Sequence, residues 1–203
     1  MHNHFHSNPD LRPAGERFFV RSEAGEDVPL RRIRLSDTPE CFGGGRNPDF
    51  FMTDVTGGYG AADAGETVEL VRRERPEPGS PTQLAAARAG VVTPEMAYAA
   101  ARENANLEGF AASLSEPGLE RVRDRLMPLL ERVEPWTGER VRARVAARQA
   151  VIPAAFTHPE VEPTVIGRHF ATKVNANVGT SASSSDWREE GRKMQEALAR
   201  GAD

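Results

Sequence analysis

Three polar side chains alternate with apolar ones in the stretch from Thr172 to Gly179, TKVNANVG. If this stretch is a strand, Lys173, Asn175 and Asn177 lie on one face and the apolar residues lie on the other. Amide side chains donate and accept hydrogen bonds without adding charge, so this face suits a small polar ligand. The backbone amides that follow Gly179 and open the next helix suit an anionic group on that ligand.

Other residues with reactive side chains have simpler explanations. His158 in THPE is a candidate acid or base because the pKa of histidine lies near neutrality, and the alternative is that it shapes a turn. Cys41 lies in a glycine-rich loop without an identifiable neighbouring base. Glu95 and Glu103 are two turns apart on one predicted helix. A partner of the helix dipole and a surface charge account for them better than a carboxylate pair does.

The polar stretch predicts a βα unit, with a strand over residues 172–179 and a helix that begins near Asp186. Asp186 is placed to cap that helix, and Glu189 follows at the capping-box spacing. An apolar stripe runs along the helix through Trp187, Met194 and Leu198. After Gly201 an α/β protein would begin its next parallel strand, so the chain is expected to be truncated at its end.

The preceding residues predict an N-terminal α/β domain over residues 17–150, after a polar tail over residues 1–16, so the fold class is α/β. Residues 17–22 and 28–36 favour a hairpin. Residues 37–65 are expected to form a long loop, in which three glycines (43–45) either hold a phosphate or are flexible. Ser80 and Thr93 are expected to cap two helices within residues 81–104, and further helices are expected over residues 118–134 and 137–148.

The composition of the 203 residues excludes several function classes. The formal net charge is −4 and no polybasic block is present, so nucleic acid is a poor candidate partner. No apolar run reaches the length of a membrane span and no signal peptide is evident, so a cytoplasmic protein is expected. Cys41 is the only cysteine, and one thiolate cannot hold an iron–sulfur cluster or a zinc ion.

Four runs in the same order resemble the phosphomethylpyrimidine synthase (ThiC) family, over about Val28 to Asp203. They are VPLRRIRLSDT, TDVTGGYG, TQLAAARAGVVTPEMAYAAAREN and VIPAAFTHPEVEPTVIGRHFATKVNANVGTSA. The combinations TPEM with REN, and HPE with IGR and NANVG, are the most specific. The second run is the weakest of the four and matches mainly as an Asp-Thr-Gly-Tyr pattern.

The resemblance implies a radical S-adenosylmethionine (SAM) lyase with a [4Fe-4S] cluster and a divalent metal, zinc, that converts 5-aminoimidazole ribotide into hydroxymethylpyrimidine phosphate for thiamine. It also implies a homodimer in which an N-terminal α/β domain precedes a (β/α)₈ barrel. Residues 151–203 would then be the truncated start of that barrel, with Thr172 to Gly179 as its first strand. The substrate-binding asparagine of the family falls on Asn177, with Asn175 and Lys173 as weaker candidates. The other metal, substrate and cluster ligands belong to sequence beyond this chain, which alone is expected to bind no cofactor and to be inactive.

The chain departs from the family pattern where the family has asparagine, at Ala155, Thr157, His169 and Thr180. These departures suggest a divergent paralogue and leave two alternatives open. One is an enzyme similar to 5-hydroxybenzimidazole synthase, which starts from the same ribotide. The other is a non-catalytic module for dimerisation or ribotide binding.

Overall fold

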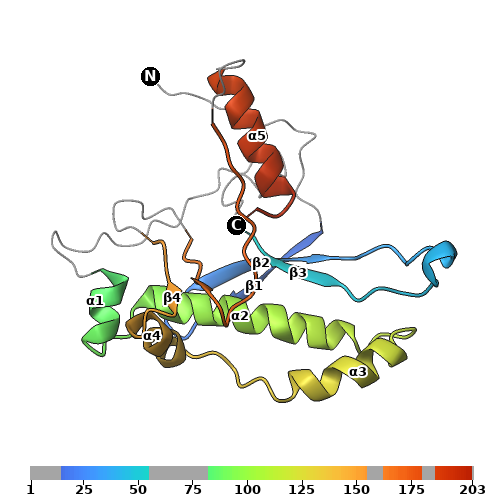
Figure 1. Cartoon of the computed structure of the whole chain (residues 1–203), viewed down its shortest axis with the longest axis horizontal. Coiled ribbons are helices and arrows are strands. Elements are labelled where there is room, and N and C mark those ends of the chain that lie inside the picture. The colour runs from blue at the N-terminus through green and yellow to red at the C-terminus, as the bar shows by residue number, and fades with distance from the viewer. Residues whose placement is uncertain (1–14, 55–81, 155–161, 180–185, 203) are drawn as a thin grey trace.

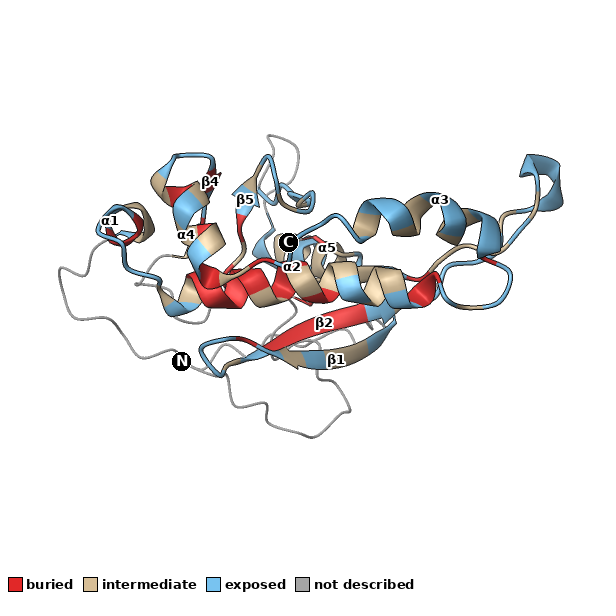
Figure 2. Ribbon diagram, turned by 90° about the horizontal axis from the view of Figure 1, so that it is seen from below, coloured by how far each residue is buried: buried red, intermediate tan, exposed pale blue. Residues whose placement is uncertain are grey.

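The computed structural model of the chain describes residues 15–54, 82–154, 162–179 and 186–202. A three-stranded antiparallel sheet of β1 (Glu16–Arg21), β2 (Asp27–Ile33) and β3 (Phe50–Thr53) has the order β1-β2-β3. The long helix α2 (Pro94–Ser113) packs against this sheet (Figure 1). Buried residues concentrate on the central strand and on the N-terminal half of α2 (Figure 2). The predicted tail falls almost entirely outside the described residues.

The predicted hairpin of β1 and β2 is confirmed. Its turn is closed by the backbone bond from Ser22 N to Glu26 O (2.9 Å), and the Ser22 hydroxyl accepts from Glu26 N at 3.0 Å. Gly25 has φ +85°, a conformation that glycine adopts without strain. Val28 and Leu30 are fully buried against α2, in a core cluster with Tyr98.

The prediction of one long loop over residues 37–65 is wrong, because β3 lies within it. Leu30 pairs with Thr53 and Ile33 pairs with Phe50 across the sheet. Phe51 lies against Gly109 of α2, where any side chain would collide with the ring. The run FFMT has strong β propensity, but its partners on β2 are 17 to 23 residues away. The Gly and Pro residues around it favoured the prediction of a loop.

The three consecutive glycines of that region form a tight turn after the 3₁₀ helix η1 (Glu40–Phe42). All three have left-handed φ values. The amides of Gly43 and Gly44 donate to Glu40 O and Pro39 O, at 2.9 and 3.2 Å. Two of the three amides are therefore already bonded, which argues against the phosphate-binding alternative.

The two helices expected within residues 81–104 are present with different limits. Thr82, rather than Ser80, caps α1 (Gln83–Arg88), since its hydroxyl accepts from Ala85 N at 3.2 Å. Thr93 caps α2 as predicted, with Pro94 in the first turn, but α2 continues to Ser113. The alanines of its N-terminal half present small side chains, which allow close approach to the sheet and to the helix of residues Gly138–Ala146.

Two further helices agree with the predicted pattern. Helix α3 (Glu120–Leu130) contains Pro128 and has no buried residue. Helix α4 (Gly138–Ala146) is capped by Thr137, as predicted. A core cluster joins α4 to α1 and α2 through Ala87, Met96, Ala99, Ala100, Trp136, Val141, Val145, Ala150, Ile152 and Val165.

The region after residue 150 begins with β4 (Ala150–Val151), which pairs antiparallel with β5 (Ile166–Gly167). The predicted domain boundary at 150/151 therefore falls inside β4. Ile152 and Val165 share the core of α2 and α4, so the described residues on either side of the gap at 155–161 pack with the preceding helices. The division into two domains stays a prediction.

The strand predicted over residues 172–179 is wrong, because this segment has no regular secondary structure and is mostly exposed. A strand needs a neighbour for its backbone groups, and no described strand pairs with it. The start of a barrel stays a prediction. The helix that follows, α5 (Trp187–Ala199), is capped by Asp186 as predicted and stands apart from α1 to α4 (Figure 1). Among the described helices, none is both long and apolar enough to cross a bilayer.

Candidate functional site

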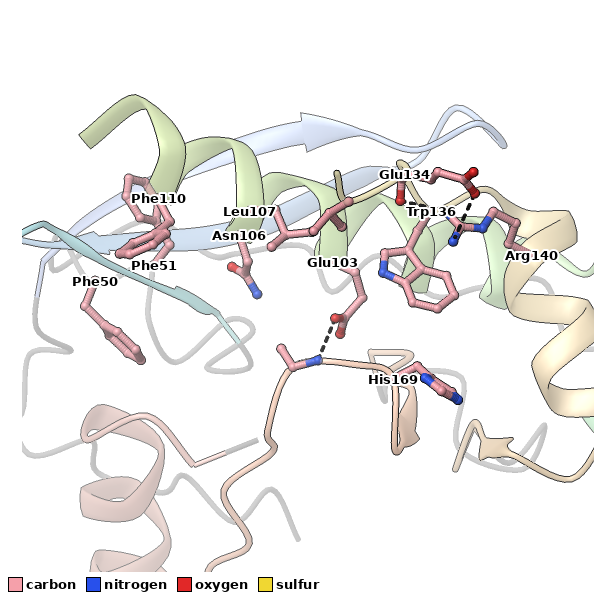
Figure 3. A pocket seen from close by; sticks show the side chains of 12 residues that line it. Phe50, Phe51, Glu103, Asn106, Leu107, Phe110, Glu134, Trp136, Arg140 and His169 are labelled. Atoms are coloured by element: carbon pink, nitrogen blue, oxygen red, sulfur yellow. Dashed lines mark hydrogen bonds and ion pairs between the residues drawn. The ribbon is translucent and has the colours of Figure 1, made fainter. Parts of the chain in front are cut away.

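A buried carboxylate on α2 holds the start of the segment that carries the predicted site. Oε2 of Glu103 accepts from the Ala171 amide at 2.8 Å, and Oε1 accepts from Lys173 Nζ at 2.7 Å (Figure 3 draws the Ala171 bond). Lys173 Nζ also donates to Ala171 O at 2.7 Å. These three residues are called the Glu103 clamp below.

The clamp is an ion pair shielded from water. The side chains of Glu103 and Lys173 are 5% and 11% exposed. Both carboxylate oxygens are bonded, which offsets part of the cost of removing the two charges from water. The interpretation of Glu103 as a surface charge is therefore wrong, whereas Glu95 does lie in the first turn of α2, near the positive end of the dipole.

Glu103 belongs to three consecutive α2 residues that each hold a different remote segment. Arg102 Nη1 donates to Pro163 O at 2.8 Å. Asn104 exchanges two bonds with the backbone of Trp136, through its Nδ2 to Trp136 O (2.8 Å) and its Oδ1 from Trp136 N (2.7 Å). Successive helical residues point in different directions, so one turn of α2 positions segments on three sides.

The two candidate asparagines lie together on the exposed segment after the clamp. Asn175 Nδ2 donates to Asn177 Oδ1 at 3.1 Å. The alternation of the sequence predicted that they share one side, and the structure brings them together without a strand. Lys173 does not join them, because its ammonium group is held by Glu103.

Most of the expected anion site lies outside the described residues, because the amides of residues 180–185 belong to it, but the amide of Gly179 itself is already bonded to a carboxylate. Gly179 N donates to Glu190 Oε2 of α5 at 2.9 Å. Hydrogen bonds from Lys193 and from the Gly179 amide lower the pKa of Glu190, which keeps it ionised. An anionic ligand at this amide would therefore have to displace Glu190.

A second set of buried charges joins the sheet to residues 162–163. Glu162 accepts from the Tyr98 hydroxyl at 2.9 Å and lies 3.8 Å from Arg102 Nη2. Burial raises the pKa of Glu162, and the charge of Arg102 opposes that shift only in part.

Asp54 at the end of β3 forms the other part of this set. Its Oδ2 is 2.9 Å from Arg17 Nε and 3.0 Å from Arg31 Nε. Burial lowers the pKa of Arg31 despite the neighbouring carboxylate. We interpret these groups as structural, since Asp54 joins the ends of the three strands and Glu162 joins α2 to the segment before β5.

The sequence comparison covers the part of the chain that contains these contacts. The sequence model of the Radical SAM ThiC family matches residues 82–203, more than half of the chain. The chain belongs to the radical SAM ThiC family. The matched region includes the Glu103 clamp and both asparagines, and it leaves out β1 to β3. At the level of the family, this indicates a radical SAM enzyme with a function in thiamine biosynthesis like that of phosphomethylpyrimidine synthase.

Full-length radical SAM enzymes of this family use SAM and a [4Fe-4S] cluster, and the residues of this chain do not fit the cluster. Such a cluster is held by several cysteine thiolates. The sequence contains one cysteine, Cys41, which is exposed after β2. Within the described ranges, no three His, Cys, Asp or Glu side chains group as metal ligands. No chemical step through the cluster is therefore assigned to these residues.

The remaining predicted positions divide by where they lie. His158, Ala155, Thr157 and Thr180 are outside the described residues. His169 is exposed after β5, near the Glu103 clamp (Figure 3). The clamp was not predicted from the sequence, although the sequence contained a signal for the burial of Glu103. Glu103 is seven residues after the buried Met96 and therefore lies on the same side of α2.

Proposed function

We propose that this chain is the N-terminal part of a phosphomethylpyrimidine synthase, which converts 5-aminoimidazole ribotide to hydroxymethylpyrimidine phosphate by radical SAM chemistry. The observation that carries the proposal is the family match over residues 82–203, which contains the NANVG run. The cluster, SAM and a divalent metal such as zinc belong to other parts of the full enzyme. A homodimer is part of the same proposal.

In this proposal Asn177 binds the ribotide, with Asn175 as its support. The bond between them uses the Asn177 oxygen and leaves its Nδ2 group to donate to a ring nitrogen or a ribose oxygen. Both side chains are exposed, so a ligand reaches them without rearrangement of the core. Lys173 has a positioning role here, because its charge is neutralised by Glu103.

Calorimetric binding of aminoimidazole ribotide to the chain tests this role. Asn177→Asp places a negative charge next to a phosphorylated ligand and should weaken binding more than the same change at Asn175. Gln149→Glu is the matched control, since it makes the same amide-to-acid change at an exposed position beyond α4. Equal affinities for wild type and Asn177→Asp would remove Asn177 from the site.

Two alternatives differ from this proposal, one in the product formed and the other in the absence of catalysis. The departures at Ala155, Thr157, His169 and Thr180 suggest a divergent paralogue, and one alternative is an enzyme that forms a benzimidazole product from the same ribotide. Product analysis of the full-length enzyme under anaerobic conditions separates this alternative from the pyrimidine product. The other alternative is a non-catalytic module for dimerisation or ribotide binding, which needs no cluster. That alternative fails if anaerobic reconstitution of this chain gives one cluster per monomer or per dimer.

A further inference from the structure

A pocket of about 490 Å³ opens between α2, β3 and the residues that lead into α4 (Figure 3). This volume is within the usual range for small-molecule sites. Most of its wall is apolar and is formed by Phe50, Phe51, Leu107, Phe110 and Trp136. The pocket reaches Glu103 at one end and does not include the segment with the two candidate asparagines, so it is separate from the proposed ribotide site.

The indole of Trp136 is held firmly in this wall, and its N–H is not used. The ring is 7% exposed, stacks on Phe170 with the ring centroids 4.2 Å apart, and has the Arg140 guanidinium 4.8 Å from its centroid. Two bonds from Asn104 fix the backbone of the same residue. Nε1 points toward Glu103 and the pocket (Figure 3), and it donates to no described residue. A buried indole N–H normally has an acceptor, so this one is available to a ligand.

Asn106 of α2 places a second N–H donor in the same wall. Its Oδ1 is shielded from solvent, whereas its Nδ2 is not among the shielded atoms without a partner. Nδ2 is turned toward the same side of α2 as Glu103 and donates to no described residue (Figure 3). The free polar groups of the two wall residues are therefore both donors, and a ligand that complements them supplies acceptors.

The ionisable groups of the wall offer no free buried charge. The carboxylate of Glu103 is paired with Lys173 at 2.7 Å. Arg140 donates to Glu134 O at 2.6 Å and lies 3.5 Å from Glu134 Oε2. His169 is the remaining ionisable side chain, and it is exposed, so water screens any charge that it carries. Nothing in the pocket then offsets the cost of burying a charged ligand, and a neutral ligand is favoured.

We infer that this pocket binds a small neutral aromatic molecule that carries a hydrogen-bond acceptor such as a carbonyl oxygen. The ring of the ligand packs against the phenylalanines of β3 and α2, whose edges and faces suit it. The oxygen accepts from Trp136 Nε1, which is the more buried donor, and Asn106 Nδ2 is open to a second acceptor. Because the Trp136 ring is already fixed, little conformational freedom is lost when this bond forms.

Acetophenone is the probe, and its binding to the whole chain is followed by NMR titration. We expect a saturable shift of the Trp136 indole N–H signal and of the amides of residues 103–110, with a Kd on the order of 1 mM. The indole signal of Trp187 on α5, assigned with Trp187→Phe, should not move. α-Methylstyrene has the same shape with a methylene group in place of the oxygen and should bind about three- to tenfold more weakly. Benzoate, which adds a negative charge, should also bind more weakly than acetophenone.

Trp136→Phe keeps an aromatic ring and removes the donor. In this variant acetophenone should lose its advantage over α-methylstyrene, whereas Trp187→Phe makes the same change on α5 and should preserve it. If Trp136→Phe does not fold, the comparison of the ligands on the wild type decides. Equal binding of acetophenone and α-methylstyrene to the wild type, an unmoved Trp136 indole signal, or tighter binding of benzoate overturns the inference. None of these outcomes depends on the ribotide.

Discussion

Helices α2 and α5 look alike in the sequence and differ in their surroundings. Each begins at a capping side chain with acidic residues in its first turn. Nine residues of α2 are buried, against the sheet, α4 and the segment before β5. On α5 only Ala199 is buried, and Trp187 is 57% exposed.

The difference shows that capping and periodicity determine where a helix forms but not how much it stabilises the fold. Most helical stability in proteins comes from packing of the apolar face. The buried side of α2 packs against the sheet, α1 and α4. The apolar stripe of α5 remains largely open within the described residues. We therefore expect the stability of the chain to depend on α2 far more than on α5.

A matched pair of methionines gives the largest expected contrast. Met96 on α2 is fully buried and Met194 on α5 is 39% exposed. Met96→Ala should lower the free energy of unfolding by about 2–5 kcal/mol, and Met194→Ala should lower it by less than about 1 kcal/mol. Urea unfolding followed by circular dichroism measures both. Similar losses would mean that α5 is packed as tightly as α2.

The Glu103 clamp joins α2 to the segment that leads to α5, so breaking the clamp should release this segment from α2. Glu103→Gln keeps the size of the side chain but removes its charge from a shielded pair, which should cost about 3 kcal/mol. Hydrogen exchange at residues 171–178 should become faster than in the wild type.

Glu95→Gln is the control for the clamp, because Glu95 lies on the same helix and outside the buried pair. It should change stability by less than about 0.5 kcal/mol. Adding Lys173→Met to Glu103→Gln should recover part of the loss, because no buried charge is then left unpaired. Unchanged exchange at the Ala171 amide in Glu103→Gln would show that the clamp does not hold this segment.

Features set by neighbouring residues were predictable from the sequence. The hairpin of β1 and β2, and the caps Thr93, Thr137 and Asp186, all depend on groups within a few residues of one another. Local preferences and local hydrogen bonds are sufficient for such elements. The shared side of Asn175 and Asn177 belongs to the same class, because it follows from alternation along an extended backbone.

Features set by distant partners were not predictable in the same way. Phe50–Thr53 is a strand because β2 offers an edge, and residues 172–179 are not, because no described strand does. Both stretches have β-type patterns, so the pattern alone could not separate them. The partners of Lys173 and Asn104 are likewise about 70 and 30 residues away. The spacing of Glu103 indicated burial but not what it would bind.

The capping residues allow the comparison of helices to be tested without changing the core. Thr93 caps α2 and its hydroxyl also donates to Gln83 Oε1 at 2.7 Å, which links α1. Thr93→Ala should cost about 1–2 kcal/mol in urea unfolding. Asp186→Ala should cost about 0.5 kcal/mol and act mainly on the helicity of α5. A larger loss of stability for Asp186→Ala than for Thr93→Ala would mean that α5 contributes more to the stability of the chain than α2 does.

The smallest effect on stability is expected from pH, and its sign differs between Glu162, which contacts α2, and Glu190 on α5. Burial raises the pKa of Glu162 above 4.5, so the folded state binds this proton more tightly than the unfolded state does. Its contribution to stability is therefore complete below about pH 4.5 and is lost as pH rises through the folded pKa. Glu190 behaves oppositely, because bonds from Lys193 and Gly179 lower its pKa, and its contribution is lost as pH falls.

Glu162→Gln and Glu190→Gln separate these two contributions. Glutamine at position 162 still accepts from the Tyr98 hydroxyl but no longer titrates. Between pH 4 and pH 7 the stability of the wild type relative to Glu162→Gln should fall, and relative to Glu190→Gln it should rise. Urea midpoints at several pH values measure both differences. If both differences change with the same sign, one of the two carboxylates does not have the surroundings described here. Glu162 contacts α2 and Glu190 contacts the exposed segment. The two differences therefore show whether burial shifts the pKa near α2 while hydrogen bonds shift the pKa near the exposed segment.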